Sequence, residues 1–455
     1  MGRRARSGKK TPASRSKRPI RERLRESNPV LVVIYGYIGY IALGALLLAV
    51  PFFHSHSVSF LDSTFVSASA VSTTGLTPVN ISDDYNAVGQ FIILFLIQIG
   101  GIGYMTFSSF VLLSRRHVLT DKRKDVSKTV FSIPKDFLID KFLIKVVIFT
   151  GIFEAIGAAG LYFVFRAEGV RHPLWQAIFT SVSAFCTAGF SLFGDNLEAF
   201  AGNFWLNFIV SVLSISGAIG FIVFVDMFNT ITRKQEHLSF TSRIIIRTTF
   251  WILVLGTFLV LVTEGSFRDL TNFERIMASF FQVMTSMTTV GFNTMPIAPM
   301  AKSVLFLTIL LMMIGASPAG TGGGMKSTTL TAVIGQIRSV IFNKGDVRYW
   351  KQRIPAERVR QANATMGMYL AALFLGVYLL TLTESAPLME IFFEAASALG
   401  TVGLSMDFTS DLSTLGKFVI ILLMFIGRVG PLTFGIAIFV KGKLIWDNSR
   451  TDLAI

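Results

Sequence analysis

Four short segments decide the fold: Ser72-Thr-Thr-Gly-Leu76, Cys186-Thr-Ala-Gly-Phe190, Thr288-Thr-Val-Gly-Phe292 and Gly400-Thr-Val-Gly-Leu404. Each has a threonine two residues before its glycine, and a phenylalanine stands ten residues before each of these glycines. Successive glycines are 114, 102 and 112 residues apart. Shared residues at fixed offsets and near-even spacing indicate a fourfold internal repeat.

Each repeat has the same order of apolar segments. A long apolar run is followed by about a dozen moderately apolar residues, then by the Thr-x-Gly segment and a second apolar run. A spanning helix needs about 20 apolar residues, so the shorter stretch predicts a re-entrant half-helix. The sequence therefore predicts an all-α polytopic membrane protein. Eight transmembrane helices and four re-entrant half-helices would form four pseudo-symmetric repeats around a central pore.

Composition and charge distribution agree with a multispanning protein. Of the 455 residues, 52% are hydrophobic and 15% are charged, whereas a typical soluble domain has about 25% charged residues. The net charge is +15, yet 34 of the 42 lysines and arginines lie in the two tails and in alternate connections. This positive-inside pattern predicts that both termini are cytoplasmic, and it disfavours nucleic-acid binding.

The predicted boundaries follow from the apolar runs. Residues 1–27 form a basic cytoplasmic tail that we expect to be disordered, and residues 444–455 form a cytoplasmic C-terminus. Pore repeats are expected at residues 28–120, 138–235, 243–345 and 360–443. The long charged N-terminus lacks the pattern of a cleavable signal peptide, so we expect the first apolar run to remain as a membrane helix. A single cysteine, Cys186, excludes an intrachain disulfide.

The Thr-x-Gly segments have the chemistry of a cation filter. Non-helical backbone at membrane depth is tolerated where it lines a water-filled cavity, and glycine lets successive carbonyls point at one axis. Four converging loops supply rings of oxygen ligands, and each half-helix dipole favours a cation at its carbonyl end. A single such segment would more simply be a connecting loop, but four matching copies disfavour that interpretation. The predicted potassium selectivity filter consists of Thr73, Thr74, Gly75, Thr187, Ala188, Gly189, Thr289, Val290, Gly291, Thr401, Val402 and Gly403.

The third repeat contains a stretch that cannot remain a regular helix. Gly315-Ala-Ser-Pro-Ala-Gly-Thr-Gly-Gly-Gly-Met-Lys326 has five glycines and a proline between two apolar runs. Repeat symmetry places it just below the predicted filter, although a kink for packing is the alternative. Its end is close to a phosphate-binding motif, but Met325 replaces the glycine required before Lys326, so we reject nucleotide binding here.

Further ionisable residues lie within apolar segments. An unpaired charge is costly there, so we expect Arg428 to face the pore cavity or an acidic group. Glu154 is expected to pair within the protein, and Asp226 to be hydrated near a helix end. Glu394 lies in the fourth half-helix, where it could attract cations. We expect that only the third repeat has a broken inner helix and that only the fourth repeat has an arginine within its inner helix.

These motifs resemble the Trk/Ktr/HKT superfamily of potassium transporters. The resemblance covers residues 28–440. It includes Gln98-Ile-Gly-Gly-Ile-Gly-Tyr-Met-Thr-Phe107 and Phe425-Ile-Gly-Arg-Val-Gly-Pro-Leu-Thr-Phe434, which are similar to inner helices of Ktr membrane subunits. The chain is most similar to the KtrB and KtrD type, because its first repeat follows the basic tail without room for an additional N-terminal helix pair.

The resemblance implies a potassium uptake subunit of the bacterial plasma membrane, not an enzyme. It implies a homodimer with one pore per protomer, embedded in a lipid bilayer and controlled by a cytoplasmic nucleotide-binding ring of the RCK/KTN type, similar to KtrA or KtrC. It implies no cofactor in this chain, transport of K⁺ and stimulation by Na⁺. Related plant proteins with serine at the first filter glycine transport sodium, so Gly75 favours potassium.

The resemblance also implies where the pore is controlled. Residues 315–329 would form an intramembrane gate beneath the filter, and Arg428 would form a barrier at the same level. The predicted gate residues are Gly315, Ala316, Ser317, Gly320, Thr321, Gly322, Gly323, Gly324 and Lys326.

Two alternatives remain open. A secondary transporter that couples potassium to sodium or proton movement would have the same composition. A membrane enzyme would need a nucleophile–base pair or a cluster with metal-ligand spacing, and no such cluster stands out in the sequence, where the five histidines lie in connections.

Overall fold

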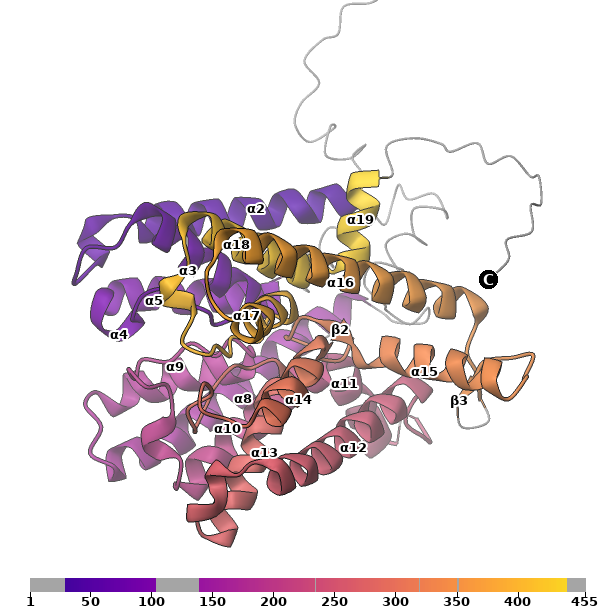
Figure 1. Cartoon of the computed structure of the whole chain (residues 1–455). Coiled ribbons are helices and arrows are strands. Elements are labelled where there is room, and N and C mark those ends of the chain that lie inside the picture. Colours follow the sequence, from indigo (N-terminus) through magenta and orange to yellow (C-terminus); the bar gives the residue numbers. More distant parts are fainter. Residues whose placement is uncertain (1–28, 104–138, 234, 319, 350–351, 440–455) are drawn as a thin grey trace, which may run out of the picture.

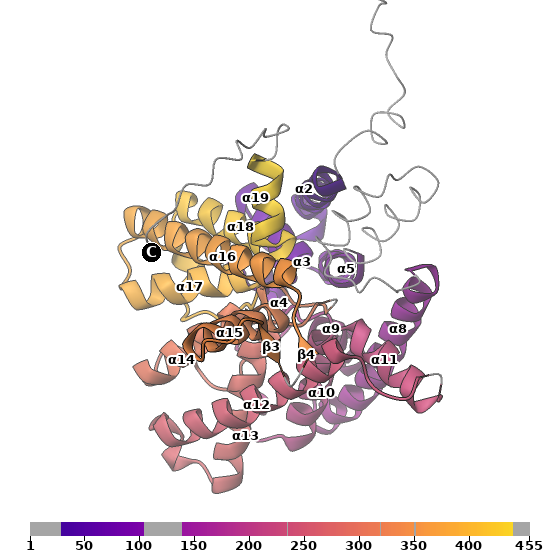
Figure 2. The ribbon, with the colours of Figure 1, turned by 90° about the vertical axis from the view of Figure 1, so that its right-hand side faces the viewer.

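The structure is a computed structural model that describes residues 29–103, 139–233, 235–318, 320–349 and 352–439 (Figures 1 and 2). The predicted tails 1–27 and 444–455 lie outside the described residues. So do residues 104–138, which include the predicted end of repeat 1 and the whole connection to repeat 2. The described chain is mostly helical, which agrees with the predicted all-α fold class.

Each repeat begins with a long outer helix. These helices are α2 (Pro29–Leu48), α8 (Ile139–Ala167), α12 (Phe240–Thr263) and α16 (Ala356–Thr383). Within the described residues, α8, α12 and α16 are each long and apolar enough to cross a membrane alone. Large side chains such as Phe250, Trp251 and Phe258 are exposed along α12, as expected of a surface that faces lipid.

A half-helix follows each outer helix. The four half-helices are α3 (Phe60–Ser72), α9 (Pro173–Phe185), α13 (Asn272–Thr288) and α17 (Leu388–Gly400). With 13 or 17 residues they extend about 20–26 Å, which is too short to cross a bilayer. The repeated phenylalanines are fully buried in these half-helices, so they serve packing; they are Phe65, Phe179, Phe281 and Phe393.

The described inner helices of repeats 2 and 4 are interrupted as well as that of repeat 3, which contradicts the expectation that only the third would break. In repeat 1, α5 (Ala87–Gln98) continues as a π-helical turn, η2 (Ile99–Gly103). In repeat 2, α10 (Phe204–Ile219) and α11 (Phe221–Ile231) meet at a bend of 93°. In repeat 4, α18 (Thr414–Val429) is followed by α19 (Pro431–Phe439).

Single glycines cause the breaks in repeats 2 and 4. Gly220 and Gly430 have φ of +93° and +92°, which no right-handed helix contains. The sequence signal was one glycine at Gly220 and a Gly-Pro pair at Gly430, compared with five glycines and a proline in repeat 3. In repeat 3, α14 (Lys302–Met313) and α15 (Ser327–Ile341) are separated by a loop whose ends pair as parallel strands, β1 (Ile314–Gly315) and β2 (Met325–Lys326).

Short elements complete the connections. Turns of helix occur at η1 (Pro51–Phe53), α4 (Ile81–Asp84), η3 (Glu198–Phe200), η4 (Ser266–Asp269) and η5 (Thr409–Asp411). A small antiparallel hairpin, β3 (Arg348–Tyr349) and β4 (Gln352–Arg353), lies between repeats 3 and 4.

The four repeats close on themselves, so that the last lies beside the first in both views (Figures 1 and 2). Helix α18 of repeat 4 packs on α3 of repeat 1, and Lys417 Nζ lies 2.7 Å from Asp62 Oδ1 across this junction. Trp175 Nε1 donates to Gln90 Oε1 at 2.8 Å between repeats 2 and 1. Helices α14 and α17 pack between repeats 3 and 4. The result is a closed arrangement of four units.

Candidate functional site

The four half-helices end in the same way, at the four repeated threonines. Their φ values lie between +51° and +59°, so in every repeat the backbone leaves the half-helix through a threonine in the left-handed conformation. The amide of the next residue then donates to a carbonyl five residues back, as Thr74 N does to Ser69 O at 2.9 Å. The same bond recurs in the other repeats from Ala188, Val290 and Val402. We call Thr73, Thr187, Thr289 and Thr401 the threonine ring.

The four repeated glycines form a second, closed ring, which we call the glycine ring. All four have positive φ, from +66° to +100°. Each packs on the residue that precedes the glycine of the next repeat, because a methyl group on it would overlap that residue's carbonyl oxygen. The overlaps run from Gly75 to Ala188, from Gly189 to Val290, from Gly291 to Val402 and from Gly403 to Thr74. This cyclic order shows that the four Thr-x-Gly segments surround one axis.

Small hydroxyl side chains fix the shape of these segments. Gly75 N donates to Ser69 Oγ at 3.0 Å in repeat 1, and Gly403 N donates to Ser397 Oγ at 3.0 Å in repeat 4. In repeat 3 the equivalent Thr285 Oγ1 instead donates to Phe292 O at 2.6 Å. The hydroxyl groups of Ser69, Thr285 and Ser397 thus hold the turn in repeats 1, 3 and 4.

The glycine-rich loop of repeat 3 lies directly against the threonine ring. Thr321 Oγ1 is 3.2 Å from Thr187 Oγ1, and Thr73 Oγ1 donates to Thr321 O at 3.5 Å. A methyl group on Gly322 would overlap Thr289 Oγ1, and one on Gly323 would overlap Thr401 Oγ1. Three consecutive loop residues thus contact all four threonines. The loop therefore crosses the axis on the threonine side of the glycine ring.

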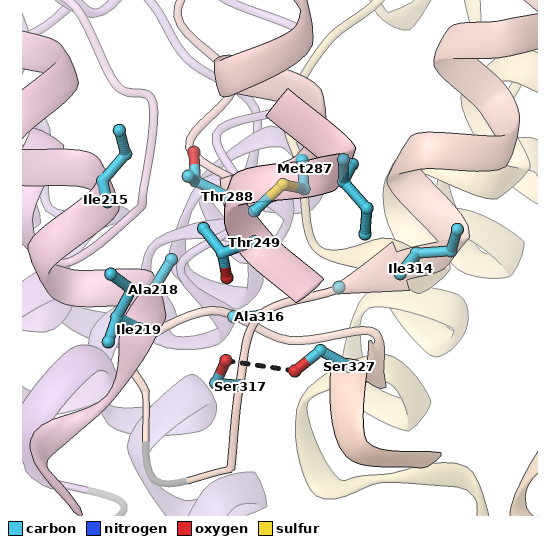
Figure 3. A pocket seen from close by; sticks show the side chains of 12 residues that line it. Ile215, Ala218, Ile219, Thr249, Met287, Thr288, Ile314, Ala316, Ser317 and Ser327 are labelled. Carbon is cyan, nitrogen blue, oxygen red and sulfur yellow. Dashed lines mark hydrogen bonds between the residues drawn. The ribbon is translucent and has the colours of Figure 1, made fainter. Parts of the chain in front are cut away.

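Several contacts hold this loop in place. Ser317 N donates to Ala218 O at 2.9 Å and Thr321 N donates to Gly217 O at 3.1 Å, both at the end of α10. Ser317 Oγ and Ser327 Oγ are 3.1 Å apart, beside a small apolar cavity between the loop, α10, α12 and α13 (Figure 3). Residues 327–329 belong to the first turn of α15, so the irregular stretch ends before them.

Two cationic side chains bind the carbonyls of the loop. Lys326 Nζ donates to Gly322 O at 2.7 Å and to Gly323 O at 3.3 Å. Arg428, only 6% exposed, donates through Nη1 to Thr321 O and to Thr73 Oγ1, the latter at 2.8 Å.

Arg428 also reaches the first repeat. Its Nη2 donates to Gly100 O in the π-helical turn, and its Nε donates to Tyr37 OH at 3.1 Å. The guanidinium therefore joins the loop of repeat 3 to the outer helix, the half-helix end and the inner helix of repeat 1. Its five N–H donors make such multiple bonding possible.

The three carboxylates that the sequence places within apolar segments, Glu154, Asp226 and Glu394, lie in distinct surroundings, and Glu154 is only half-buried. Glu154 Oε2 accepts from Gln98 Nε2 at 3.1 Å, so it pairs within the protein as expected. The expectation of a hydrated Asp226 is wrong, because this residue is buried and its Oδ2 accepts from Ser239 N at 2.7 Å, at the start of α12. Glu394 is fully buried behind the Thr-x-Gly segment of repeat 4.

On the side away from the loop, a cavity of about 310 Å³ reaches the glycine ring. Its lining includes Gly75 and Gly189, together with polar residues such as Asn80, Ser191 and Asn196. The glycine ring is thus reached by this cavity on one side and covered by the loop on the other. Among the described residues, no group of three His, Cys, Asp or Glu side chains could hold a metal ion.

Comparisons with known proteins agree with this architecture. The TrkH family, described as "Cation transport protein", matches residues 8–444. The chain is 34% identical to the potassium/sodium uptake protein NtpJ of Enterococcus hirae, over 95% of this chain and 97% of that protein. It is 33% identical to the Ktr system potassium uptake protein B of Bacillus subtilis, over 93% of this chain and 95% of that protein.

A solved structure shares the fold. The potassium transporter TrkH from Vibrio parahaemolyticus superposes with a TM-score of 0.68 at 19% identity, covering 90% of this chain and 84% of that chain. The match to the family over nearly the whole sequence, together with the two full-length relatives, leads to one conclusion. This chain belongs to the TrkH family of cation transport proteins and is a membrane transporter.

Proposed function

We propose that this chain carries potassium across the plasma membrane, as the ion-translocating subunit of a Ktr-type uptake system. The observation that carries the proposal is the closed ring of four glycines, in which each glycine packs against a backbone carbonyl oxygen of the next repeat. Such a ring presents backbone oxygens to one axis, which is how a dehydrated cation is bound in potassium filters. Two relatives that align over nearly their full length are named as potassium or potassium/sodium uptake proteins.

The proposed filter consists of the four Thr-x-Gly segments. Carbonyls of the residues at and before each glycine would form the binding rings, and the threonine hydroxyls would add oxygens at the inner end. The half-helices α3, α9, α13 and α17 all end at this ring, so their negative dipole ends would stabilise a cation there. Each segment has only one such glycine, which favours fewer binding rings than a longer signature would give.

We also propose that the gate predicted at residues 315–329 consists of the loop up to Lys326 and the first turn of α15, and that Lys326 and Arg428 hold the loop in place electrostatically. In support, the loop contacts all four threonines, and both cations donate to its carbonyls. A positive charge beside the axis opposes a passing cation, so the two side chains would act as a barrier when the loop is docked. Movement of the loop would then open the path.

The assembly is part of the same proposal. The chain would form a homodimer, with each protomer divided into repeats at 28–120, 138–235, 243–345 and 360–443 and with both termini cytoplasmic. A cytoplasmic ring of RCK/KTN-type subunits would bind nucleotide and move the gate, and Na⁺ would stimulate uptake. The name of the B. subtilis relative, which describes it as part of a system, supports a partnered protein.

Reversal potentials of the purified full chain in proteoliposomes test the proposal. A channel-like pathway predicts that the reversal potential follows the K⁺ gradient and is unchanged when the Na⁺ or H⁺ gradient is varied. A shift with either of those gradients at a fixed K⁺ gradient would support the coupled secondary transporter instead. Absence of any K⁺ or Rb⁺ flux, with and without a cognate regulatory ring, would refute both readings.

A further inference from the structure

Glu394 is a fully buried carboxylate that ties the outer side of the fourth Thr-x-Gly segment to its half-helix. It has no exposed surface within α17, and both of its oxygens accept hydroxyl groups. Ser405 Oγ donates to Oε2 at 2.8 Å, and Thr409 Oγ1 donates to Oε1. Ser405 Oγ also accepts from Phe408 N at 3.1 Å. The carboxylate thus organises the segment that leaves Gly403.

The other three repeats have no carboxylate at this place. The residues nine positions before their glycines are Val66, Thr180 and Gln282. A buried carboxyl group is costly to desolvate unless hydrogen bonds replace water. The two hydrogen bonds to hydroxyl groups therefore give repeat 4 an attachment that an apolar side chain could not provide.

The hydrogen bonds of Glu394 affect the glycine ring because Gly403 lies in the segment that they hold. On one side Gly403 N donates to Ser397 Oγ at 3.0 Å, and on the other side Ser405 is held by Glu394. Gly403 contacts its neighbours in the ring on both sides, since a Cβ on Gly291 would lie 3.0 Å from Gly403 Cα. A Cβ on Gly403 would lie 3.1 Å from Gly75 Cα. A shift of Gly403 would thus alter the spacing of two neighbouring segments.

We propose that Glu394 is a positioning residue that sets the preference for K⁺ over Na⁺ by holding the fourth filter segment at a fixed distance from the axis. The inference rests on the proposed filter function. Selection between ions that differ chiefly in size and hydration requires carbonyls of fixed number and position. Loosening one segment lets the ring contract around the smaller ion.

The test compares Rb⁺ and Na⁺ uptake by full-length variants in proteoliposomes. Glu394→Gln and Thr409→Val each weaken the attachment, whereas Thr409→Ser keeps the hydroxyl. We expect the first two to lower the Rb⁺/Na⁺ uptake ratio about fivefold or more, and Thr409→Ser to retain the wild-type ratio. A merely structural role would lower both fluxes together and leave the ratio unchanged.

Glu384→Gln is the matched control. Glu384 also lies in repeat 4 and accepts from Ser413 N at 3.1 Å and from Ser413 Oγ, but it joins the end of α16 to the start of α18. Its variant is expected to keep the wild-type ratio. Wild-type ratios in both Glu394→Gln and Thr409→Val would overturn the inference. If the wild-type protein itself did not distinguish Rb⁺ from Na⁺, the proposed filter would be refuted instead. Failure of the inference about Glu394 can therefore be told apart from failure of the proposed filter.

A second inference comes from the break between α10 and α11. In a continuous helix, Gly217 O and Ala218 O would accept from the amides of Phe221 and Ile222. At the break these carbonyls accept instead from Thr321 N and Ser317 N of the loop. Carbonyls at a helix end point along the axis, so the loop lies where the next turn of α10 would run.

We infer that the docked loop and a straight α10–α11 helix exclude each other, so that release of the loop and straightening of the second inner helix occur together. The inference rests on the proposed gate. Gly220, with φ of +93°, is the residue that permits the bend. Gly320 of the loop packs closely on α10, because a Cβ on Gly320 would lie 2.5 Å from the carbonyl oxygen of Ala218.

Spin labels on cysteines at positions 205 and 231 measure the bend directly. Trp205 and Ile231 are 63% and 75% exposed, and the native Cys186 is buried. At 1.5 Å per residue, the two positions are about 27 Å apart across the 93° bend and about 39 Å apart in a straight helix. Shortening residues 315–324 is expected to populate the longer distance.

Gly220→Ala provides a second route, because alanine disfavours the positive φ and favours the helix. We expect it to populate the longer distance and to raise flux in the absence of a regulator. Gly430→Ala is the matched control, since φ is +92° at the break of repeat 4, and it should leave the distance short. Short distances in both the loop-shortened protein and Gly220→Ala would overturn the inference. If the loop-shortened protein showed increased flux while the distance between the two spin labels stayed short, the proposed gate would stand. Only the inferred straightening of the second inner helix would be refuted.

Discussion

Replacing Gly75 with serine tests the glycine ring most directly. Gly75 has φ of +100°, and a side chain there would overlap the carbonyl oxygen of Ala188 in repeat 2. The variant must therefore change its own backbone, displace that carbonyl, or do both. Either adjustment acts on a proposed ion ligand and not on the lipid-facing surface.

The size of the effect follows from the backbone. A non-glycine residue in a sparsely populated φ region costs about 1–3 kcal/mol. If the displaced carbonyl removes a similar amount of the difference in binding between K⁺ and Na⁺, the selectivity falls about 5- to 150-fold. The closed ring predicts that the same substitution at Gly403, which would displace Thr74 O, has a comparable effect.

Competition between Rb⁺ and Na⁺ uptake in proteoliposomes measures this change. Gly367→Ser in α16 is the control, because no atom lies within 4 Å of the position its Cβ would occupy. The control should keep the wild-type ratio and flux. An unchanged Rb⁺/Na⁺ ratio in correctly folded Gly75→Ser protein would refute the assignment of this glycine to the filter.

Three further predictions concern the gate, the contact between repeats 4 and 1, and the dependence of stability on pH. Arg428→Gln removes a charged donor from Thr321 O, so regulator-free Rb⁺ flux should rise roughly tenfold, as measured in proteoliposomes. Lys417 and Asp62 are 16% and 18% exposed, so a double-mutant cycle of thermal stability with Lys417→Met and Asp62→Asn should give a coupling of about 0.5–3 kcal/mol. Burial raises the pKa of Glu198 above its ordinary 4.5, so the folded protein binds this proton more tightly and loses stability as pH rises from 4.5 through the raised pKa. Glu198→Gln should flatten that decline in melting scans across this pH range.

Much of the site could be predicted from the sequence because its signals are repeated. Four copies of Thr-x-Gly at matched offsets indicated which residues would come together, and the structure brings all four segments around one axis. The broken third inner helix was also predicted, since five glycines and a proline cannot form a regular helix. The break at Gly220 was missed because a single glycine within an apolar run does not by itself end a helix, whereas the break at Gly430 had a stronger signal, since Pro431 follows this glycine.

Partners that are distant in the sequence could not be predicted. Arg428 was expected to face a cavity or an acid, yet it bonds to a carbonyl of the third repeat and to three groups of the first. Asp226 was expected to be hydrated, yet the start of α12 covers it. The role of Glu394 depends on Ser405 and Thr409, whose hydroxyls reach it only after the segment beyond Gly403 folds back.

By itself, the sequence determined the membrane class, the fourfold repeat and the positions of the four Thr-x-Gly segments after the half-helices. These properties depend on local hydropathy and on residues a few positions apart, which one stretch of chain specifies on its own. Only the tertiary structure decided which carbonyl each glycine meets, which threonines the loop covers and which groups Arg428 joins. These contacts join residues that are as much as several hundred positions apart, such as Tyr37 and Arg428, and they form only when the four repeats close around their common axis.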